Sequence, residues 1–233
     1  MNRTTYIDQI RQMYALVAVF SKKNGCEVMR LQNKKTGKEL VLRSYSQPVT
    51  AYEKLQNMRC DNLPEIYDVL ELEDGQIVLE EYIDGITVAQ VMETGKYCKA
   101  GARKVLLGVC DALTVLHGQG VIHRDVKPEN VIIEKSGRVV LIDLNASRME
   151  SHASKDTVVM GTVGYAPPEQ LGISQSDART DIYASGVLYN VMLTGQHPSV
   201  EIALGKAGRI VRKCVAINPD ERYQTAARLW SAL

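Results

Sequence analysis

One short stretch of the chain concentrates the side chains that could do chemistry. Residues 123–130 (HRDVKPEN) bring together an imidazole, a guanidinium, carboxylates, an amine and an amide, and a further carboxylate, Asp143, follows soon after. A carboxylate can accept a proton in a general-base step, and carboxylate and amide oxygens are ligands that Mg²⁺ prefers. Asp125 taken alone is better explained as a solvated loop residue. The combination of these residue types at this spacing favours a catalytic site.

The same stretch resembles the catalytic loop of protein kinases, whose pattern is HRDxKxxN. Residues 141–145 (LIDLN) stand where that family has its metal-binding DFG triplet, with Asn145 in place of the glycine. Residues 161–169 (GTVGYAPPE) are similar to the end of a kinase activation segment, which would extend over 143–169. The motifs follow the family's order along nearly the whole chain. The sequence therefore looks like a minimal bacterial-type, Hanks-type serine/threonine kinase domain.

The resemblance implies transfer of the ATP γ-phosphate to a protein hydroxyl, a reaction that mainly needs positioning and neutralisation of phosphate charge. Asp125 would accept the hydroxyl proton, and Lys127 would reach the transferred phosphate. Asn130 and Asp143 would supply oxygen ligands to Mg²⁺. Lys127 is typical of the serine/threonine branch. Thr162 agrees with that branch, because its hydroxyl there bonds the catalytic aspartate.

Two residues of the loop have structural or regulatory interpretations. His123 could be a general base, but the family's histidine packs against the aspartate of the metal-binding triplet. Arg124 resembles the arginine of kinases whose activation loop is ordered by phosphorylation, because an arginine and a phosphate form a strong bidentate contact. Thr157 is the first candidate for the modified residue, ahead of Ser154 and Ser151. A merely solvated polar loop remains the alternative.

Three residues of the C-terminal half match structural positions of the family. Asp181 corresponds to the buried aspartate that opens the next large helix, and Arg222 to the late arginine that pairs with the glutamate at the end of the activation segment. That glutamate is Glu169. We therefore expect a buried ion pair between Glu169 and Arg222.

The nucleotide side departs from the family pattern. With Val28 as the final valine of the glycine-rich loop, the three glycine positions hold Ser21, Lys23 and Cys26. The Asn24-Gly25 pair predicts a tight hairpin turn in place of a phosphate cradle. Lys22 or Lys23 could reach back to the phosphates, although a solvated turn lysine is the simpler interpretation of each.

The strand that should carry the phosphate-binding lysine reads LVLR, so that Arg43 takes the lysine position and Val41 replaces a small residue next to adenine. The nearest helix carboxylate, Glu53, is out of phase with the expected position, so an ion pair between Arg43 and Glu53 is doubtful. Glu80 occupies the gatekeeper position with no partner that the sequence identifies. The nucleotide-binding residues implied by the resemblance come from both halves of the chain: Val28, Val41, Arg43, Glu81, Ile83 and Ile132.

The hydrophobic periodicity indicates the elements that position these residues. In the first third, the patterns predict an antiparallel sheet of about five strands at 14–20, 26–31, 40–45, 66–72 and 76–83. One helix is expected at about 48–59, with Leu55 and Met58 facing inward. Further on, helices are expected at 100–118, 181–193, 206–217 and 224–233, with short strands at 131–133 and 139–142. The expected fold is α+β and bilobal, with an N-terminal lobe at 1–82 and a larger, mainly helical lobe at 83–233.

Composition limits the remaining possibilities. The chain has 233 residues, 45% hydrophobic and 24% charged, with a net charge of +1, as in an ordinary globular domain. A charge so close to zero gives no reason to expect nucleic acid as a partner. The five scattered cysteines indicate neither a disulfide framework nor a zinc site, and they favour a cytoplasmic setting. No apolar run is long enough to insert into a membrane.

Three functions remain open at this stage. The first is an active serine/threonine kinase that uses ATP and Mg²⁺ on a protein substrate. The second is a pseudokinase that binds nucleotide or a regulatory protein partner, which the eroded glycine loop would suit. The third is a small-molecule kinase of the aminoglycoside or choline type, which fits poorly because such enzymes lack the segment at 161–169.

Overall fold

The computed structural model describes residues 1–23, 25–149, 165–167 and 176–233, and these form two compact units. Unit 1 comprises Met1–Arg59 and Pro64–Ile83, and unit 2 comprises Cys60–Leu63 and Asp84–Leu233. The short segment 60–63 joins unit 2 through hydrogen bonds. Asn62 Nδ2 donates to the Val139 oxygen over 2.7 Å, and the Leu141 amide donates to the Asn62 oxygen over 2.9 Å.

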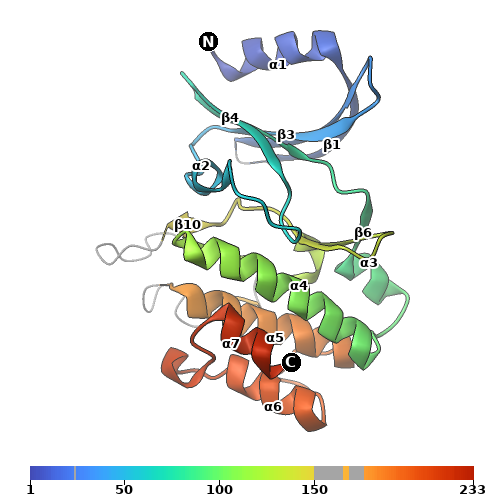
Figure 1. Cartoon of the computed structure of the whole chain (residues 1–233), viewed down its shortest axis with the longest axis vertical. Coiled ribbons are helices and arrows are strands. Elements are labelled where there is room, and N and C mark those ends of the chain that lie inside the picture. The colour runs from blue at the N-terminus through green and yellow to red at the C-terminus, as the bar shows by residue number, and fades with distance from the viewer. Residues whose placement is uncertain (24, 150–164, 168–175) are drawn as a thin grey trace. The chain divides into compact units, whose positions relative to one another are not determined.

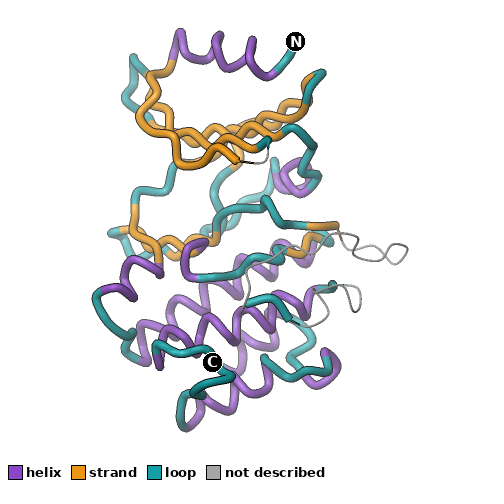
Figure 2. The backbone as a smooth tube through the Cα atoms, turned by 180° about the vertical axis from the view of Figure 1, so that it is seen from behind, coloured by secondary structure: helices purple, strands orange, loops and turns teal. Residues whose placement is uncertain are grey.

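Unit 1 contains an antiparallel sheet (Figures 1 and 2). The order of its strands is β1-β2-β3-β5-β4. Its strands are β1 (Tyr14–Lys23), β2 (Cys26–Asn33), β3 (Glu39–Tyr45), β4 (Ile66–Leu72) and β5 (Gly75–Glu81). The five-stranded antiparallel sheet expected from the alternation of side chains is therefore confirmed. The strand β1 lies at an edge, and its pairing with β2 is interrupted by two irregularities.

The register of the sheet assigns each side chain to one of two faces, because directly opposed residues point to the same side. Arg43 of β3 lies opposite Val28 of β2 and Val78 of β5, so these three share one face. Leu42 lies opposite Met29 on the other face. That second face holds the core cluster of Ile10, Met29, Leu31, Leu40, Leu42 and Ile77.

A helix that the sequence patterns did not lead us to expect covers the second face. Helix α1 (Arg3–Met13) begins at Asn2, whose side chain accepts a hydrogen bond of 2.9 Å from the Thr5 amide, and it places the buried Ile10 in the core cluster. Figure 1 shows α1 on one side of the sheet. The expectation of a single helix in this part of the chain was therefore wrong.

The second helix of unit 1 is shorter than the predicted 48–59. Helix α2 (Ala51–Leu55) buries Ala51, Tyr52 and Leu55. Met58 is 37% exposed. The inward direction predicted for Met58 was wrong because the helix ends at Leu55, and helical periodicity does not extend beyond that end.

Unit 2 is mainly helical, and short strands flank the loops between its helices. Its regular elements are β6 (Gly85–Thr87), α3 (Val88–Glu93), α4 (Lys99–Gly118), β7 (Val121–Ile122), η1 (Pro128–Asn130), β8 (Val131–Glu134), β9 (Val139–Leu141), β10 (Arg148–Met149), α5 (Ala178–Thr194), α6 (Gly205–Cys214), η3 (Pro219–Glu221) and α7 (Ala226–Ala232). The four predicted helices are present. Helix α5 begins earlier than the predicted residue 181, because the side chain of Asp177 caps its first turn.

Close approach of two helices in unit 2 depends on one glycine. A Cβ atom added to Gly186 of α5 would lie 2.3 Å from the Cβ atom of Cys214 in α6. The absence of a side chain at Gly186 lets α6 pack directly on α5. In the described part of the chain, no helix is both long and apolar enough to cross a membrane.

Candidate active site

The segment between β7 and β8 brings three of the expected residues into direct contact. Lys127 Nζ lies 2.7 Å from Asp125 Oδ2. Asn130 Nδ2 donates to the same carboxylate oxygen and to the main-chain oxygen of Asp125, each over 2.9 Å. Asn130 is buried, whereas Asp125 and Lys127 are partly exposed. The loop thus holds a carboxylate in a fixed orientation beside a positive charge, with access from solvent.

His123 connects this loop to the segment that carries Asp143. Its Nδ1 accepts a hydrogen bond of 3.3 Å from the Asp125 amide, so its Nε2 carries the proton and donates to the Ile142 oxygen over 3.1 Å. Both ring nitrogens are therefore engaged with the backbone. This arrangement favours a structural role for His123 over the general-base interpretation.

Asp143 follows directly, in a backbone conformation with φ of 71°. Its Oδ1 accepts a hydrogen bond of 3.2 Å from the Asn145 amide, and the main-chain oxygen of Asn130 accepts one of 2.9 Å from the Ile142 amide. Asn130 and the strand end before Asp143 are thereby tied together. The two residues expected to bind metal come from adjacent backbone segments.

The donor set suits Mg²⁺. Asp143 and Asn130 offer a carboxylate and an amide oxygen, and Mg²⁺ usually takes one or two protein oxygens and completes its shell with phosphate oxygens and water. Within the described residues, no three His, Cys, Asp or Glu side chains converge as a closed metal cage. The residues present therefore fit a cation that arrives with phosphates.

Helix α5 contributes one fully buried carboxylate that binds the main chain at the start of the loop 123–130. Asp181 Oδ1 accepts from the Arg124 amide over 2.8 Å, and its Oδ2 accepts from the His123 amide over 2.9 Å and lies 2.8 Å from His117 Nε2. Burial raises the pKa of Asp181, but the hydrogen bond and charge of His117, together with His123, outweigh it and hold the pKa below its ordinary value. His117 was not among the residues singled out from the sequence.

Arg124 is a second positively charged residue of the loop 123–130, besides Lys127. It is buried, with φ of 67°, and burial lowers its pKa, as does the nearby positive charge of Arg148, while Asp181 raises it. Arg148 belongs to β10, where it lies opposite Ile122 of β7. A positive charge that is opposed by a second one favours an anion beside it.

Several expected residues lie outside the described part of the chain. Thr157, Thr162 and Glu169 are among them, as are the alternatives Ser151 and Ser154. The ion pair between Glu169 and Arg222 therefore stays a prediction. Arg222 itself is 2% exposed, and its guanidinium donates to three main-chain oxygens. These belong to Ala216, Arg179 and Ile217.

In unit 1, the nucleotide-side residues share the face opposite α1. Val28, Val41 and Arg43 are all buried, and Glu80 lies opposite Val41 in the register of β3 and β5. Arg43 Nε donates to Glu80 Oε1 over 2.6 Å. The gatekeeper glutamate therefore pairs with the arginine that replaces the expected lysine.

Glu53 has a different environment. Its Oε1 accepts a hydrogen bond of 3.3 Å from Gln76 Nε2 at the other end of β5. Burial, followed by Glu71, raises the pKa of Glu53. Arg43 thus pairs with Glu80, and Glu53 contacts Gln76. The structure therefore agrees with the doubt about an ion pair between Arg43 and Glu53. The partner of Arg43 was missed because the sequence does not give the register of β3 against β5.

The hinge residues Glu81 and Ile83 flank an aromatic contact. The ring of Tyr82 stacks on Phe20 at 6.5 Å between centroids, and Arg30 Cζ lies 4.0 Å from the centre of the Tyr82 ring. Ile83 is buried, and Glu81 Oε2 accepts a hydrogen bond of 3.1 Å from the Glu65 amide. In unit 2, the partly buried Ile132 lies in β8 opposite Thr87.

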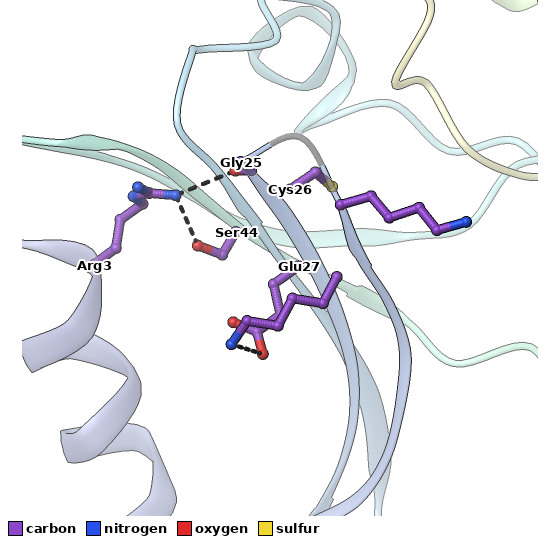
Figure 3. A pocket seen from close by; sticks show the side chains of 7 residues that line it. Arg3, Gly25, Cys26, Glu27 and Ser44 are labelled. Atoms are coloured by element: carbon purple, nitrogen blue, oxygen red, sulfur yellow. Dashed lines mark hydrogen bonds and ion pairs between the residues drawn. The ribbon is translucent and has the colours of Figure 1, made fainter.

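The turn between β1 and β2 is tied to the face that carries α1. Gly25 has φ of 75°, and its oxygen accepts from the Ser46 amide over 2.9 Å and from Arg3 Nη1 over 3.4 Å. Arg3, Gly25 and Ser44 are among the residues that line a cavity of about 260 Å³. Figure 3 shows how these residues lie relative to one another. Lys22 is exposed and its Nζ lies 3.3 Å from Glu27 Oε1, on the face away from Arg43. This placement favours the solvated interpretation of Lys22.

Comparison with known proteins agrees with this geometry. Residues 19–230 match the family model described as protein kinase domain. Serine/threonine-protein kinase PknB of Mycolicibacterium smegmatis is 32% identical over 209 residues, which cover 75% of this chain and 33% of that protein. The probable serine/threonine-protein kinase PknB of Lactococcus lactis is 32% identical over 167 residues, or 68% of this chain and 27% of that protein. The chain thus spans at most a third of the length of these curated relatives.

Proposed function

This chain belongs to the protein kinase domain family, and from that premise we propose that it transfers the γ-phosphate of ATP to serine or threonine hydroxyls of a protein substrate. The observation that carries the proposal is the contact of Asp125 with both Lys127 and Asn130. That cluster combines a proton acceptor, a cation and an oxygen ligand within one loop. The pseudokinase alternative finds no support among the relatives, which are named as serine/threonine kinases.

The residues divide the work of phosphoryl transfer among them. Asp125 orients the acceptor hydroxyl and takes its proton, and Lys127 neutralises charge on the transferred phosphate. Asn130 and Asp143 would hold Mg²⁺, which would neutralise charge on the nucleotide phosphates. Asp181 keeps the main chain of His123 and Arg124 in place, so that Asp125 enters the reaction already oriented.

We further propose that phosphorylation of the activation segment, residues 143–169, regulates the protein. Arg124 and Arg148 place two positive charges together in unit 2, and the pKa of Arg124 is lowered by burial and then by Arg148. A phosphate group would form charge-assisted hydrogen bonds with such a pair. Thr157 is the residue that we propose to carry it.

The nucleotide face of unit 1 completes the proposal. Val28, Val41, Glu81 and Ile83 would contact the nucleotide, and Arg43 would reach its phosphates. A protein hydroxyl is the acceptor, and a cytoplasmic location would give the reaction its ATP and keep the five cysteines as the free thiols that the structure has. The partner is thus a substrate or regulatory protein.

The test of this function is Asp125→Asn. The substitution keeps the shape of the side chain but removes its basicity, so we expect phosphate transfer to fall at least about 100-fold while affinity for Mg·ATP stays within about twofold. Radiolabel transfer and calorimetry measure the two quantities. Mass spectrometry of the wild type should find phosphate on Thr157 that the variant lacks.

Asp84→Asn provides the matched control, because Asp84 has an exposed side chain, 3.9 Å from Lys135, outside the cluster. It should leave transfer and affinity unchanged. Transfer that persists in Asp125→Asn at the wild-type rate would refute the kinase assignment of this cluster. A wild-type protein that transfers no phosphate at any ATP concentration would refute the proposed activity as a whole.

A further inference from the structure

The ion pair between Arg43 and Glu80 lies in the interior of unit 1. The two side chains are 6% and 5% exposed, and the Nε–Oε1 distance is 2.6 Å. Two charges withdrawn from water this far are stable when they remain paired, and removing one of them leaves the other uncompensated. Glu80 is therefore the carboxylate that keeps a charged guanidinium in this position.

The pair bridges two neighbouring strands. Arg43 of β3 lies opposite Val78, and Glu80 stands two residues farther along β5, on the same face of the sheet. A diagonal pair of this kind is within reach of long side chains. Both ends are attached to a hydrogen-bonded ladder in the middle of the sheet, so the direction of the guanidinium is set by the sheet itself.

The helix of unit 1 has no comparable part in this arrangement. The carboxylate of Glu53 in α2 contacts Gln76, which lies opposite Tyr45. Gln76 and Glu80 are four residues apart on β5, a separation of about 13 Å along an extended strand. The helix carboxylate and the Arg43 partner thus occupy different ends of the same strand.

We propose that Glu80 is the positioning residue for Arg43 in binding the phosphates of the nucleotide. The proposal deepens the kinase function proposed above and rests on it. Glu80 accepts a hydrogen bond from Nε of Arg43 and so holds the guanidinium on the sheet face that carries Val28 and Val78. Because the anchor is on the sheet, phosphate binding by Arg43 does not depend on the position of α2.

The proposal is tested with Glu80→Gln and a pair of ligands that differ in their phosphates. Calorimetry gives the affinity for Mg·ATP and for adenosine. We expect the variant to lose at least tenfold in affinity for Mg·ATP and to keep its affinity for adenosine within twofold. A role for Glu80 in stability alone would lower both affinities together, and that result would overturn the proposal.

Glu53→Gln is the matched control, because it makes the same chemical change on the helix. It should leave both affinities unchanged, and a selective loss of Mg·ATP affinity in Glu53→Gln with no loss in Glu80→Gln would also overturn the proposal. If Glu80→Gln does not fold, Glu80→Asp is used instead. It keeps the negative charge but, being one methylene group shorter, moves the carboxylate away from Arg43. That variant should reduce the ratio of ATP to adenosine affinity severalfold, and an unchanged ratio would count against the proposal.

The failure of this inference can be told apart from the failure of the proposed function. A wild-type protein that binds Mg·ATP, together with a Glu80→Gln variant that binds it equally well, overturns the positioning role and leaves the kinase function in place. A wild-type protein that binds adenosine and Mg·ATP with the same affinity overturns the use of Arg43 for phosphates and the positioning role with it.

Discussion

At the scale of single residues, three aspartates of unit 2 show how neighbours give the same side chain different tasks. Asp181 is fully buried and accepts hydrogen bonds from the main chain of the catalytic loop. Asp125 is partly exposed beside Lys127, where it can meet a substrate. Asp143 sits at a strand end with φ of 71°, next to the buried Asn130 segment. The buried aspartate stabilises the structure, and the other two are the residues that we propose to meet substrate and metal.

Asp143→Asn separates metal binding from folding. The substitution removes the negative charge that a hard cation needs, and the Asp143 side chain is only partly buried, so the fold should persist. Wild-type protein should gain about 2.7 kcal/mol of stability in Mg·ATP at 100 times its dissociation constant, and the variant should gain almost none. Thermal melting with and without Mg·ATP measures this, and circular dichroism checks the fold. A variant that is stabilised as strongly as wild type would exclude Asp143 as the metal ligand.

The sequence predicted the residues of the loop because their spacing is local. Residues separated by two to five positions, such as Asp125, Lys127 and Asn130, meet within one turn of chain. Glu80 is 37 positions from Arg43, and their meeting depends on the register of two strands. The alternation of side chains gives the face of each residue but leaves the register open. The sequence therefore identified Arg43 and Glu80 as unusual residues but did not predict that they form an ion pair.

At the scale of elements, α5 supports the catalytic loop through the Asp181 carboxylate. This contribution should appear in the free energy of unfolding and in its dependence on pH. Asp181→Asn replaces one accepting oxygen by a donor group, which leaves a buried N–H group without its partner. We expect a loss of about 3 kcal/mol at pH 7. Urea unfolding at several pH values measures it, with Asp84→Asn as the exposed control.

The sign of the pH effect follows from the pKa of Asp181, which is lower in the folded state than in the unfolded chain. Its stabilising contribution is fully present above the unfolded value of about 3.9, and it is lost as the pH falls through the folded value. The difference between wild type and Asp181→Asn should therefore shrink as the pH falls below about 4. A difference that grows below pH 4 would contradict the assignment.

Helices whose apolar residues recur clearly at helical spacing were predicted well. Helices with few apolar residues were missed or given wrong ends. The predicted helix at 100–118 has apolar residues at helical spacing, and in α4 these are all buried: Val105, Leu106, Val109, Leu113 and Leu116. Helix α1 was missed although Tyr6, Ile7 and Ile10 have helical spacing, because it has few apolar residues and is stabilised by the sheet that it covers. Met58 was misplaced because α2 ends before it.

At the scale of the whole molecule, each of the two units has its own core. In unit 1, Ile10 joins a cluster with Met29 and Leu42 beneath α1, whereas the family match begins at residue 19 and so leaves α1 outside. Unit 2 holds the one tryptophan of the chain, Trp230, in α7. The units can therefore be followed by separate signals.

Ile10→Ala should loosen unit 1 and leave unit 2 intact. Removing this buried side chain opens a cavity under α1, and such changes cost about 2–5 kcal/mol. Hydrogen exchange should lose protection at the β2 and β3 amides, while the amides of α4 and α5 and the fluorescence transition of Trp230 stay as in wild type. Met13→Ala is the control, because Met13 is at the exposed end of the same helix, 62% accessible, and should change stability by less than about 0.5 kcal/mol. An equal loss of protection in both units would mean that they unfold together and that the division into two cores has no energetic counterpart.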